Sequence, residues 1–333
     1  MNQSRFDVKL IGWFSLIFFV TQLPIYAVQY PNIQDLTNHI ARLSVQLGLS
    51  QSAALQAHYE VSWGLSPNLA LDALGQLLGP LFGPALAVKF LLSMGSLLMA
   101  SGAWALNRVL VGRTQAWVAL MPMVLLQNYF VVLGFVNYVL SIGLSLWLLA
   151  AWIHVRQGQV SNQLGLRVFF TLAAVTLYLV HLYGFAVYLI AIGVYELVRG
   201  RLLPGFRYAG VAAWRVGQQA VIPLGIHLLA YVRGTDLPVP IFGEGLIDVA
   251  TRKVLYLAMS PVLMVGEEPS GLTQILLSLL IVVPFAILHK MGRFSVYVKW
   301  LLASWVIAFM ALPRHGFGSA MVDLRMLLPL SLI

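Results

Sequence analysis

Apolar residues along the chain fall into blocks of about 18–22 positions, which short polar stretches separate. An α-helix needs about 20 apolar residues to cross the roughly 30 Å of hydrocarbon in a bilayer, whereas the strands of a membrane β-barrel alternate over about 10 residues. The pattern therefore predicts an all-α, polytopic transmembrane bundle of about 9–10 helices, with interfacial helices in the first long polar segment. The predicted membrane helices cover residues 10–30, 85–106, 114–133, 135–154, 168–180, 184–198, 217–231, 272–288 and 295–312, and a tenth begins at residue 326.

Composition favours lipid as the solvent of this chain. Hydrophobic residues make up 60% of the 333 and charged residues 9%, whereas soluble domains carry about 25% charged residues. We therefore interpret residues 1–333 as a single transmembrane domain. The chain has no cysteine, which excludes disulfides and thiolate chemistry. The first apolar block follows Arg5 and Lys9 without a small-residue cleavage signal, so we interpret it as an uncleaved membrane helix.

The basic residues indicate how the predicted helices are oriented. The formal net charge is +9, but no basic patch is interleaved with aromatic residues, so we expect lipid contacts and no nucleic-acid partner. Most Lys and Arg residues share one side of the membrane if the N-terminus is cytoplasmic and the run 168–198 crosses twice, turning near residues 181–184. All acidic residues except Asp7 and Glu196 then lie at or beyond the outer face, which indicates that polar chemistry is done there.

The first predicted outer loop, residues 31–83, opens with a dense polar pattern. Asp35, Asn38, His39 and Arg42 are spaced i, i+3, i+4 and i+7, so a helix would carry them on one face. A carboxylate, an imidazole and a guanidinium in two turns can accept a proton, donate one and hold a phosphate. The opposite face is apolar and suits the bilayer or neighbouring helices. The alternative is structural: Asp35 caps the helix, His39 packs in an interface and Arg42 reaches lipid phosphate.

The remainder of this loop contributes candidate cavity-lining residues. His58 and Glu60 are two positions apart, and Asp72 lies in an apolar stretch, residues 69–82, that is too short to span a bilayer. We expect that stretch to be an interfacial or re-entrant helix, interrupted at Gly79-Pro80. An acid at such a place faces protein or a water-filled cavity.

Two further outer loops are predicted, at residues 233–271 and 313–325. The first is rich in glycine, proline and acids that we expect to be solvated, with an apolar stretch at 254–265 that lies at the interface. The second holds Arg314, His315 and Arg325, which can grip an anionic headgroup or, alternatively, merely flank a helix end. His181 and Tyr183, at the predicted outer turn, are expected to border the same cavity.

Soluble catalytic signatures such as the phosphate-binding glycine loops and the His-Glu-x-x-His zinc motif are absent from the sequence. An aspartate just after the first membrane helix, a long first outer loop and many short apolar helices resemble the GT-C superfamily of membrane glycosyltransferases. The stretches 30–42, 59–63 and 67–72 and the pair Asn137-Tyr138 look like a poorly characterised bacterial group of that type.

The resemblance implies a function and a site. A sugar would be transferred from a polyprenyl-phosphate carrier to an acceptor on the outer face of the bacterial inner membrane. Asp35 would be the catalytic base or a metal ligand, and Arg314 or Arg325 would bind the carrier phosphate. No second acid follows Asp35, so a divalent metal is not supported and the cofactor stays open. The sequence stops within a predicted helix, whereas these enzymes continue, which indicates a truncated chain or a reduced member of the superfamily.

Two rival functions remain. The chain is alternatively a non-enzymatic subunit that lends its helices to a larger membrane complex, with other subunits as its partners. A third hypothesis is a lipid or solute transporter, which sparse intramembrane charge disfavours.

Overall fold

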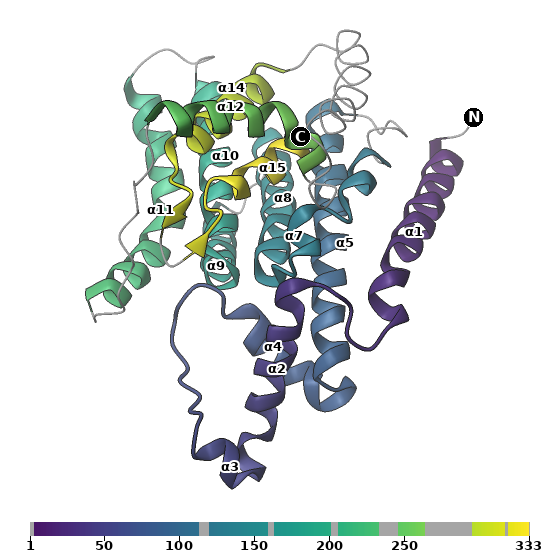
Figure 1. The fold of residues 1–333 in the computed structure, drawn as a ribbon. Helices are drawn as coiled ribbons and strands as arrows, with labels where there is room; N and C mark the ends of the chain where they lie inside the picture. Colours follow the sequence, from purple (N-terminus) through teal and green to yellow (C-terminus); the bar gives the residue numbers. More distant parts are fainter. Residues whose placement is uncertain are drawn as a thin grey trace. The chain divides into compact units, whose positions relative to one another are not determined.

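The computed structural model describes residues 3–112, 120–158, 163–200, 206–232, 246–263, 295–316 and 319–332. Nearly all of these residues are helical (Figure 1), apart from β1 (His315–Gly316) and β2 (Ser319–Ala320), which pair in an antiparallel fashion. The chain divides into two compact units, Met1–Phe185 and Ala186–Ile333.

Five described helices are long and apolar enough to cross a membrane. They are Val8–Ala27 within α1 (Gln3–Ala27), α5 (Pro84–Val111), α8 (Val136–Gln157), α9 (Gln163–Val180) and α10 (Leu182–Gly200). The prediction of a helical protein with several membrane-length apolar segments is thereby confirmed. The run 168–198 does form two helices, separated at His181.

The core of the first unit is built on the close packing of α5 against α8. Small residues permit it: a Cβ atom added at Gly143 would lie 2.6 Å from the backbone N of Met99, and one at Gly102 would lie 3.0 Å from the carbonyl O of Gly143. Helices in lipid gain little from the hydrophobic effect, so close backbone approach through small residues is how they associate.

A second layer lies against α5, formed by α2 (Gln34–Gly48) and α4 (Ala70–Phe82) (Figure 1). The apolar face predicted for α2 is buried at Leu36 and Leu43, both with no exposed surface. Gly75 and Gly79 on α4 accommodate Leu43 and Leu47 of α2. The short helices η1 (Leu49–Gln51) and α3 (Ala53–Gln56) follow α2.

Two predicted elements differ from the structure. Residues 114–133 do not form one membrane helix, because the described part contains η2 (Met121–Leu125) and α7 (Tyr129–Val132), separated at buried Asn128. The Asn128 side chain accepts hydrogen bonds from the backbone N–H groups of Phe130 and Val131 and so begins a new helix.

The second difference is in α4, which is not interrupted at Gly79-Pro80. Helix α4 continues through Pro80 and ends at Gly83, whose φ of +79° favours glycine, and α5 then begins at Pro84.

The second unit contains α11 (Phe206–Val232), α12 (Leu246–Leu263), α14 (Val296–Ala311), η3 (Leu324–Met326) and α15 (Leu327–Leu332). An ion pair of 3.0 Å joins fully buried Glu196 on α10 to Arg215 on α11. Helix α12 begins at Leu246, eight positions before the apolar stretch expected at 254–265. The predicted helix 272–288 and the acids Asp236, Glu244, Glu267 and Glu268 lie outside the described residues.

Candidate functional site

The polar face predicted for residues 35–42 is present on α2. Asp35 is half-buried in the first turn, and its Oδ1 accepts a hydrogen bond of 3.3 Å from Asn38 Nδ2. Asp35 does not cap the helix, since the N-cap position is Ile33 and no side chain caps it. A carboxylate in the first turn still lies at the positive end of the helix dipole, which is a favourable position for an acidic side chain.

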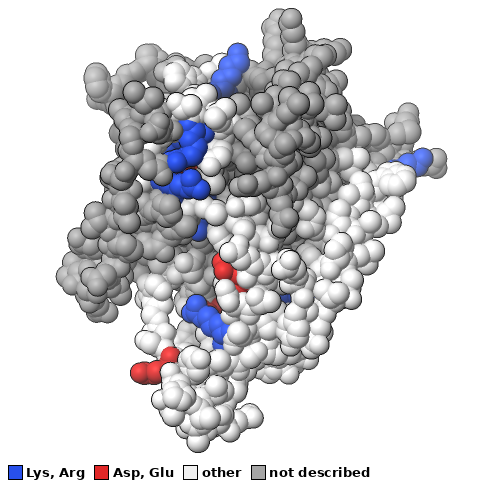
Figure 2. Space-filling view, in the orientation of Figure 1, with Lys and Arg blue, Asp and Glu red and all other residues white. Residues whose placement is uncertain are grey.

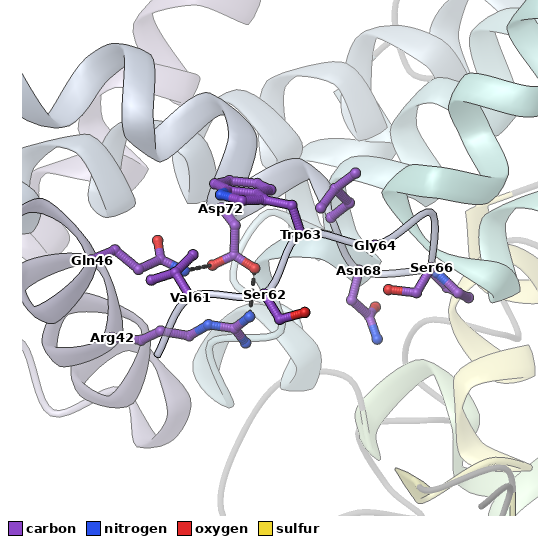
Figure 3. A pocket seen from close by; sticks show the side chains of 11 residues that line it. Arg42, Gln46, Val61, Ser62, Trp63, Gly64, Ser66, Asn68 and Asp72 are labelled. Atoms are coloured by element: carbon purple, nitrogen blue, oxygen red, sulfur yellow. Dashed lines mark hydrogen bonds and ion pairs between the residues drawn. The ribbon is translucent and has the colours of Figure 1, made fainter. Parts of the chain in front are cut away.

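Arg42 at the other end of this face forms an ion pair with Asp72 of α4 (Figure 3). The Arg42 Nη2 to Asp72 Oδ2 distance is 2.7 Å, and Gln46 Nε2 donates to Asp72 Oδ1 at 2.9 Å. The Asp72 side chain is 7% exposed and that of Arg42 is 61% exposed. The carboxylate is therefore a buried acceptor with both oxygens engaged, while the guanidinium remains open to solvent.

This ion pair forms one wall of a cavity of about 260 Å³, which we call the Asp72 pocket. The opposite wall is the extended segment 61–69, whose residues include Ser62, Trp63 and Ser66. Figure 3 shows Arg42 and Gln46 reaching from α2 towards Asp72. The complete lining is Arg42, Gln46, Val61, Ser62, Trp63, Gly64, Ser66, Pro67, Asn68, Leu69 and Asp72.

Asn137 on α8 holds the end of this wall in place. Its Nδ2 donates to the carbonyl O of Asn68 and its Oδ1 accepts from the backbone N of Leu71, both at 2.8 Å. The backbone N of Leu69 donates to Leu179 O at 2.9 Å. Asn68 has a φ of +74°, a left-handed conformation that asparagine tolerates better than most residues. The wall is thus tied to two membrane-length helices.

His39 lies between the two ends of the polar face. Burial lowers the pKa of His39 below its ordinary value of 6.5, Asp35 opposes that shift, and Arg42 and Asp72 act more weakly in opposite directions. The imidazole is therefore neutral at pH 7 and can accept a proton. Arg42 belongs both to the polar face of α2 and to the lining of the Asp72 pocket, so the two features adjoin at Arg42, although Asp35 and His39 do not line the pocket.

The other residues predicted to line a cavity lie outside the Asp72 pocket; they are His58, Glu60, His181 and Tyr183. His58 and Glu60 are exposed and do not line the pocket. His181 and Tyr183 form an aromatic cluster with Tyr138, at ring-centroid distances of 5.6 and 6.3 Å from it, and His181 Nδ1 accepts from the backbone N of Tyr183. This cluster belongs to the first unit, but its rings are not part of the pocket lining.

The predicted phosphate-binding residues Arg314, His315 and Arg325 belong to the second unit. Arg314 O accepts a bond of 2.9 Å from Val322 N, Arg325 is 7% exposed, and the side chain of His315 is outside the described residues. No group of three or more metal-ligating side chains occurs in the described ranges.

A buried ion cluster that the sequence did not predict lies near these arginines. Lys253 Nζ on α12 donates to the carbonyl oxygens of Phe309, Met310 and Leu312 at the end of α14. It also lies 3.9 Å from Asp323 Oδ2, and both side chains are at most 3% exposed. This lysine satisfies carbonyl groups that the helix end leaves without donors.

Charged side chains are few on the described surface seen in Figure 2, where they stand in small groups on an otherwise uncharged face. The involvement of Gln46 could have been predicted from the sequence, because Gln46 lies one helical turn after Arg42 on the same face of α2. Asn137 had none beyond the resemblance, because its partners are 66 and 69 positions away. Comparison of the chain with protein-family models, curated proteins and solved structures finds no match.

Proposed function

We propose that this chain is a GT-C-like membrane glycosyltransferase that moves a sugar from a polyprenyl-phosphate carrier to an acceptor on the outer face of a bacterial inner membrane. The observation that supports the proposal most is that α2, which carries Asp35 and His39, also supplies Arg42 to the Asp72 pocket and begins seven positions after α1 ends. An acid, a neutral imidazole and a cavity then lie together next to an apolar segment, where a lipid-linked donor is available.

The reaction we propose is a direct displacement at the anomeric carbon. Asp35 accepts the proton of an acceptor hydroxyl while the acceptor oxygen bonds to the anomeric carbon. The bond from that carbon to the phosphate oxygen breaks at the same time, and the polyprenyl phosphate departs with the electron pair. His39 orients the acceptor or serves as the alternative base. Arginine side chains neutralise the departing phosphate, and the resemblance assigns this role to Arg314 or Arg325.

The carboxylates of Asp35 and Asp72 do not fit a shared divalent metal. Both oxygens of Asp72 are engaged by Arg42 and Gln46, and Oδ1 of Asp35 accepts from Asn38. No step of the proposed reaction therefore uses a metal ion.

The test is a transfer assay in lipid nanodiscs with a panel of polyprenyl-phosphate sugars and lipid or polysaccharide acceptors, read out as released polyprenyl phosphate by mass spectrometry. We expect Asp35→Ala to lower the rate at least about 100-fold, because general-base catalysis contributes roughly 10²–10⁴-fold. Glu60→Ala, which changes an exposed acid of the same loop, is the matched control and should leave the rate unchanged. Unchanged activity in Asp35→Ala would sink the assignment.

A second measurement addresses the donor site. Native mass spectrometry should detect a bound polyprenyl phosphate in the wild type and its loss in Arg314→Ala/Arg325→Ala. Ordinary phospholipid alone, together with protein partners at fixed stoichiometry, would instead favour the non-enzymatic subunit.

A further inference from the structure

We propose that the Asp72 pocket binds an uncharged pyranose ring, as the subsite of the transferase that holds a sugar. This inference rests on the proposed function and specifies what the pocket takes. It also assigns Arg42 a new role, since the sequence alone placed that residue with the phosphate-binding groups.

The size of the pocket selects a small ligand. Its volume is about 260 Å³, whereas pockets for drug-sized molecules measure roughly 300–1,000 Å³. One monosaccharide ring fits such a space, but an oligosaccharide or a folded polyprenyl chain does not.

The charge of the pocket selects a neutral ligand. Arg42 and Asp72 are its only charged lining residues, and they neutralise each other at 2.7 Å. A phosphate would gain the Arg42 guanidinium but would also approach the Asp72 carboxylate, and the like charges would repel. A cationic ligand meets the reverse problem. An uncharged polar ligand incurs neither penalty.

The polar groups of the pocket match the hydroxyls of a sugar. A guanidinium has five N–H donors, so Arg42 keeps donors beyond the Nη2 contact with Asp72. An ionised carboxylate has about four lone-pair sites, so Asp72 can accept from a hydroxyl while it is held by Arg42 and Gln46. Adjacent donors and acceptors of this kind pair with neighbouring hydroxyls, each of which both donates and accepts.

Trp63 supplies the apolar component. It lines the pocket, and 54% of its surface is exposed. The face of an indole ring is electronegative, so it attracts the weakly electropositive C–H groups on one face of a pyranose. Burial of Trp63 against a ligand would also remove apolar surface from water.

The pocket is organised before any ligand arrives. The carboxylate is held by two hydrogen bonds, and the wall that carries Trp63 is anchored through Asn68 to Asn137. Preorganisation of this kind lowers the entropy lost on binding.

The experiment is saturation-transfer NMR on the protein in nanodiscs, free of sugar-based detergents. The probes are methyl glucoside, methyl mannoside and N-acetylglucosamine as neutral rings, with inorganic phosphate as the anion and glucosamine as the cation. We expect saturable binding of at least one neutral ring, weakened at least about 10-fold in Trp63→Ala. Tyr59→Ala is the matched control, because Tyr59 is also 54% exposed but does not line the pocket.

Removal of the negative charge of Asp72 completes the test. Asp72→Asn leaves Arg42 without its carboxylate, so this variant should lose the neutral ring and gain affinity for inorganic phosphate. Phosphate that outcompetes the neutral rings in the wild type would overturn the proposal, as would binding that is equal in Trp63→Ala and the wild type. Trp63 lies in an exposed segment, so Trp63→Ala should fold normally. The comparison of Trp63→Ala with the wild type therefore tests the proposal even if Asp72→Asn does not fold.

Sugar binding in the Asp72 pocket and sugar transfer by the protein can be tested separately. Asp35→Ala should retain the neutral ring, because Asp35 does not line the pocket. Ring binding without any transfer would leave the subsite standing and refute the transferase. Transfer that depends on Asp35, without ring binding at Trp63, would refute the subsite alone.

Discussion

The backbone N–H of Asp35 donates a hydrogen bond of 2.9 Å to the carbonyl O of Leu133, so the polar helix α2 begins on the turn that joins α7 to α8. Gly134 in that turn has a φ of +80°, and a Cβ atom there would lie 2.7 Å from the backbone N of Leu36. The first turn of α2 is therefore positioned by the protein interior.

Gly134→Ala should destabilise the first unit and displace Asp35. The substitution adds left-handed strain, roughly 1–3 kcal/mol, and a steric clash with a backbone atom. We expect a lower apparent Tm by scanning fluorimetry and a loss of the proposed transferase activity larger than the loss of folded protein.

Gly112→Ala is the control for Gly134→Ala. Gly112 has a φ of +74° but no atom within 4 Å of an added Cβ, so it carries the strain without the clash. Equal losses in Tm for the two variants would contradict the importance of the approach between residues 134 and 36.

Asn137→Asp should loosen the wall of the Asp72 pocket. An ionised aspartate can accept from Leu71 N but cannot donate to Asn68 O, so the partly buried hydrogen bond to that carbonyl is lost at a cost of about 0.5–1.5 kcal/mol. Hydrogen exchange across residues 61–69 should accelerate, and Asn137→Leu, which loses both bonds, should accelerate it further. Protection that is unchanged in both variants would refute the anchoring role.

His39 should make stability depend on pH. The pKa of His39 is lower in the folded state than its ordinary 6.5, so the unfolded chain binds more protons between the two values. As far as His39 is concerned, the free energy of unfolding is therefore highest above about pH 6.5, and it decreases as the pH falls from 6.5 through the lower pKa of the folded state.

Scanning fluorimetry at pH 7.5 and pH 5.5 measures this effect. His39→Gln should reduce the difference in Tm between the two pH values. His58→Gln, at an exposed histidine, is the control and should keep the wild-type difference. A larger pH dependence in His39→Gln would contradict the sign of the shift.

Lys253→Met should destabilise the second unit by about 2–4 kcal/mol, because it leaves carbonyl groups of α14 without a donor and Asp323 without its cation. Adding Asp323→Asn should cost less in this background than in the wild type, with a coupling of about 1 kcal/mol from a double-mutant cycle. Lys299→Met, on the exposed face of α14, should be nearly neutral. Strict additivity of the two changes would show that the buried charges do not interact.

Hydropathy was sufficient to predict the helical class, and helical spacing predicted the polar and apolar faces of α2, because both depend on residues close in sequence. The division of residues 168–198 near His181 was predicted instead from the distribution of basic residues, which requires that run to cross the membrane twice. Hydrophobic periodicity failed where a single polar residue divides an apolar run into separate helices. Asn128 divides the run 114–133, since its side chain binds the N–H groups of the next turn instead of lying unsatisfied in lipid.

The candidate site likewise has one part that the sequence predicts and another that it does not. The shared face of Asp35, His39 and Arg42 follows from helical spacing. The partnership of Arg42 with Asp72 does not, because 30 positions and an extended segment separate them, and their meeting depends on how α2 packs on α4. Lys253 and Asp323 were likewise beyond periodicity, since 70 positions separate them and helix packing decides their burial.

The packing of α2 on α4 determines how the two helices are aligned along their length. A Cβ atom at Gly75 would lie 2.9 Å from Leu43 Cδ1, and one at Gly79 would lie 2.5 Å from Leu47 Cδ1, so each leucine packs where a glycine of α4 leaves space for it. Both contacts recur after four positions, so a slip of α2 along α4 by less than one turn, about 5.4 Å, would take both leucines away from their glycines. Substitutions in residues 61–67 can therefore change one wall of the Asp72 pocket, while the alignment of Arg42 with Asp72 stays unchanged.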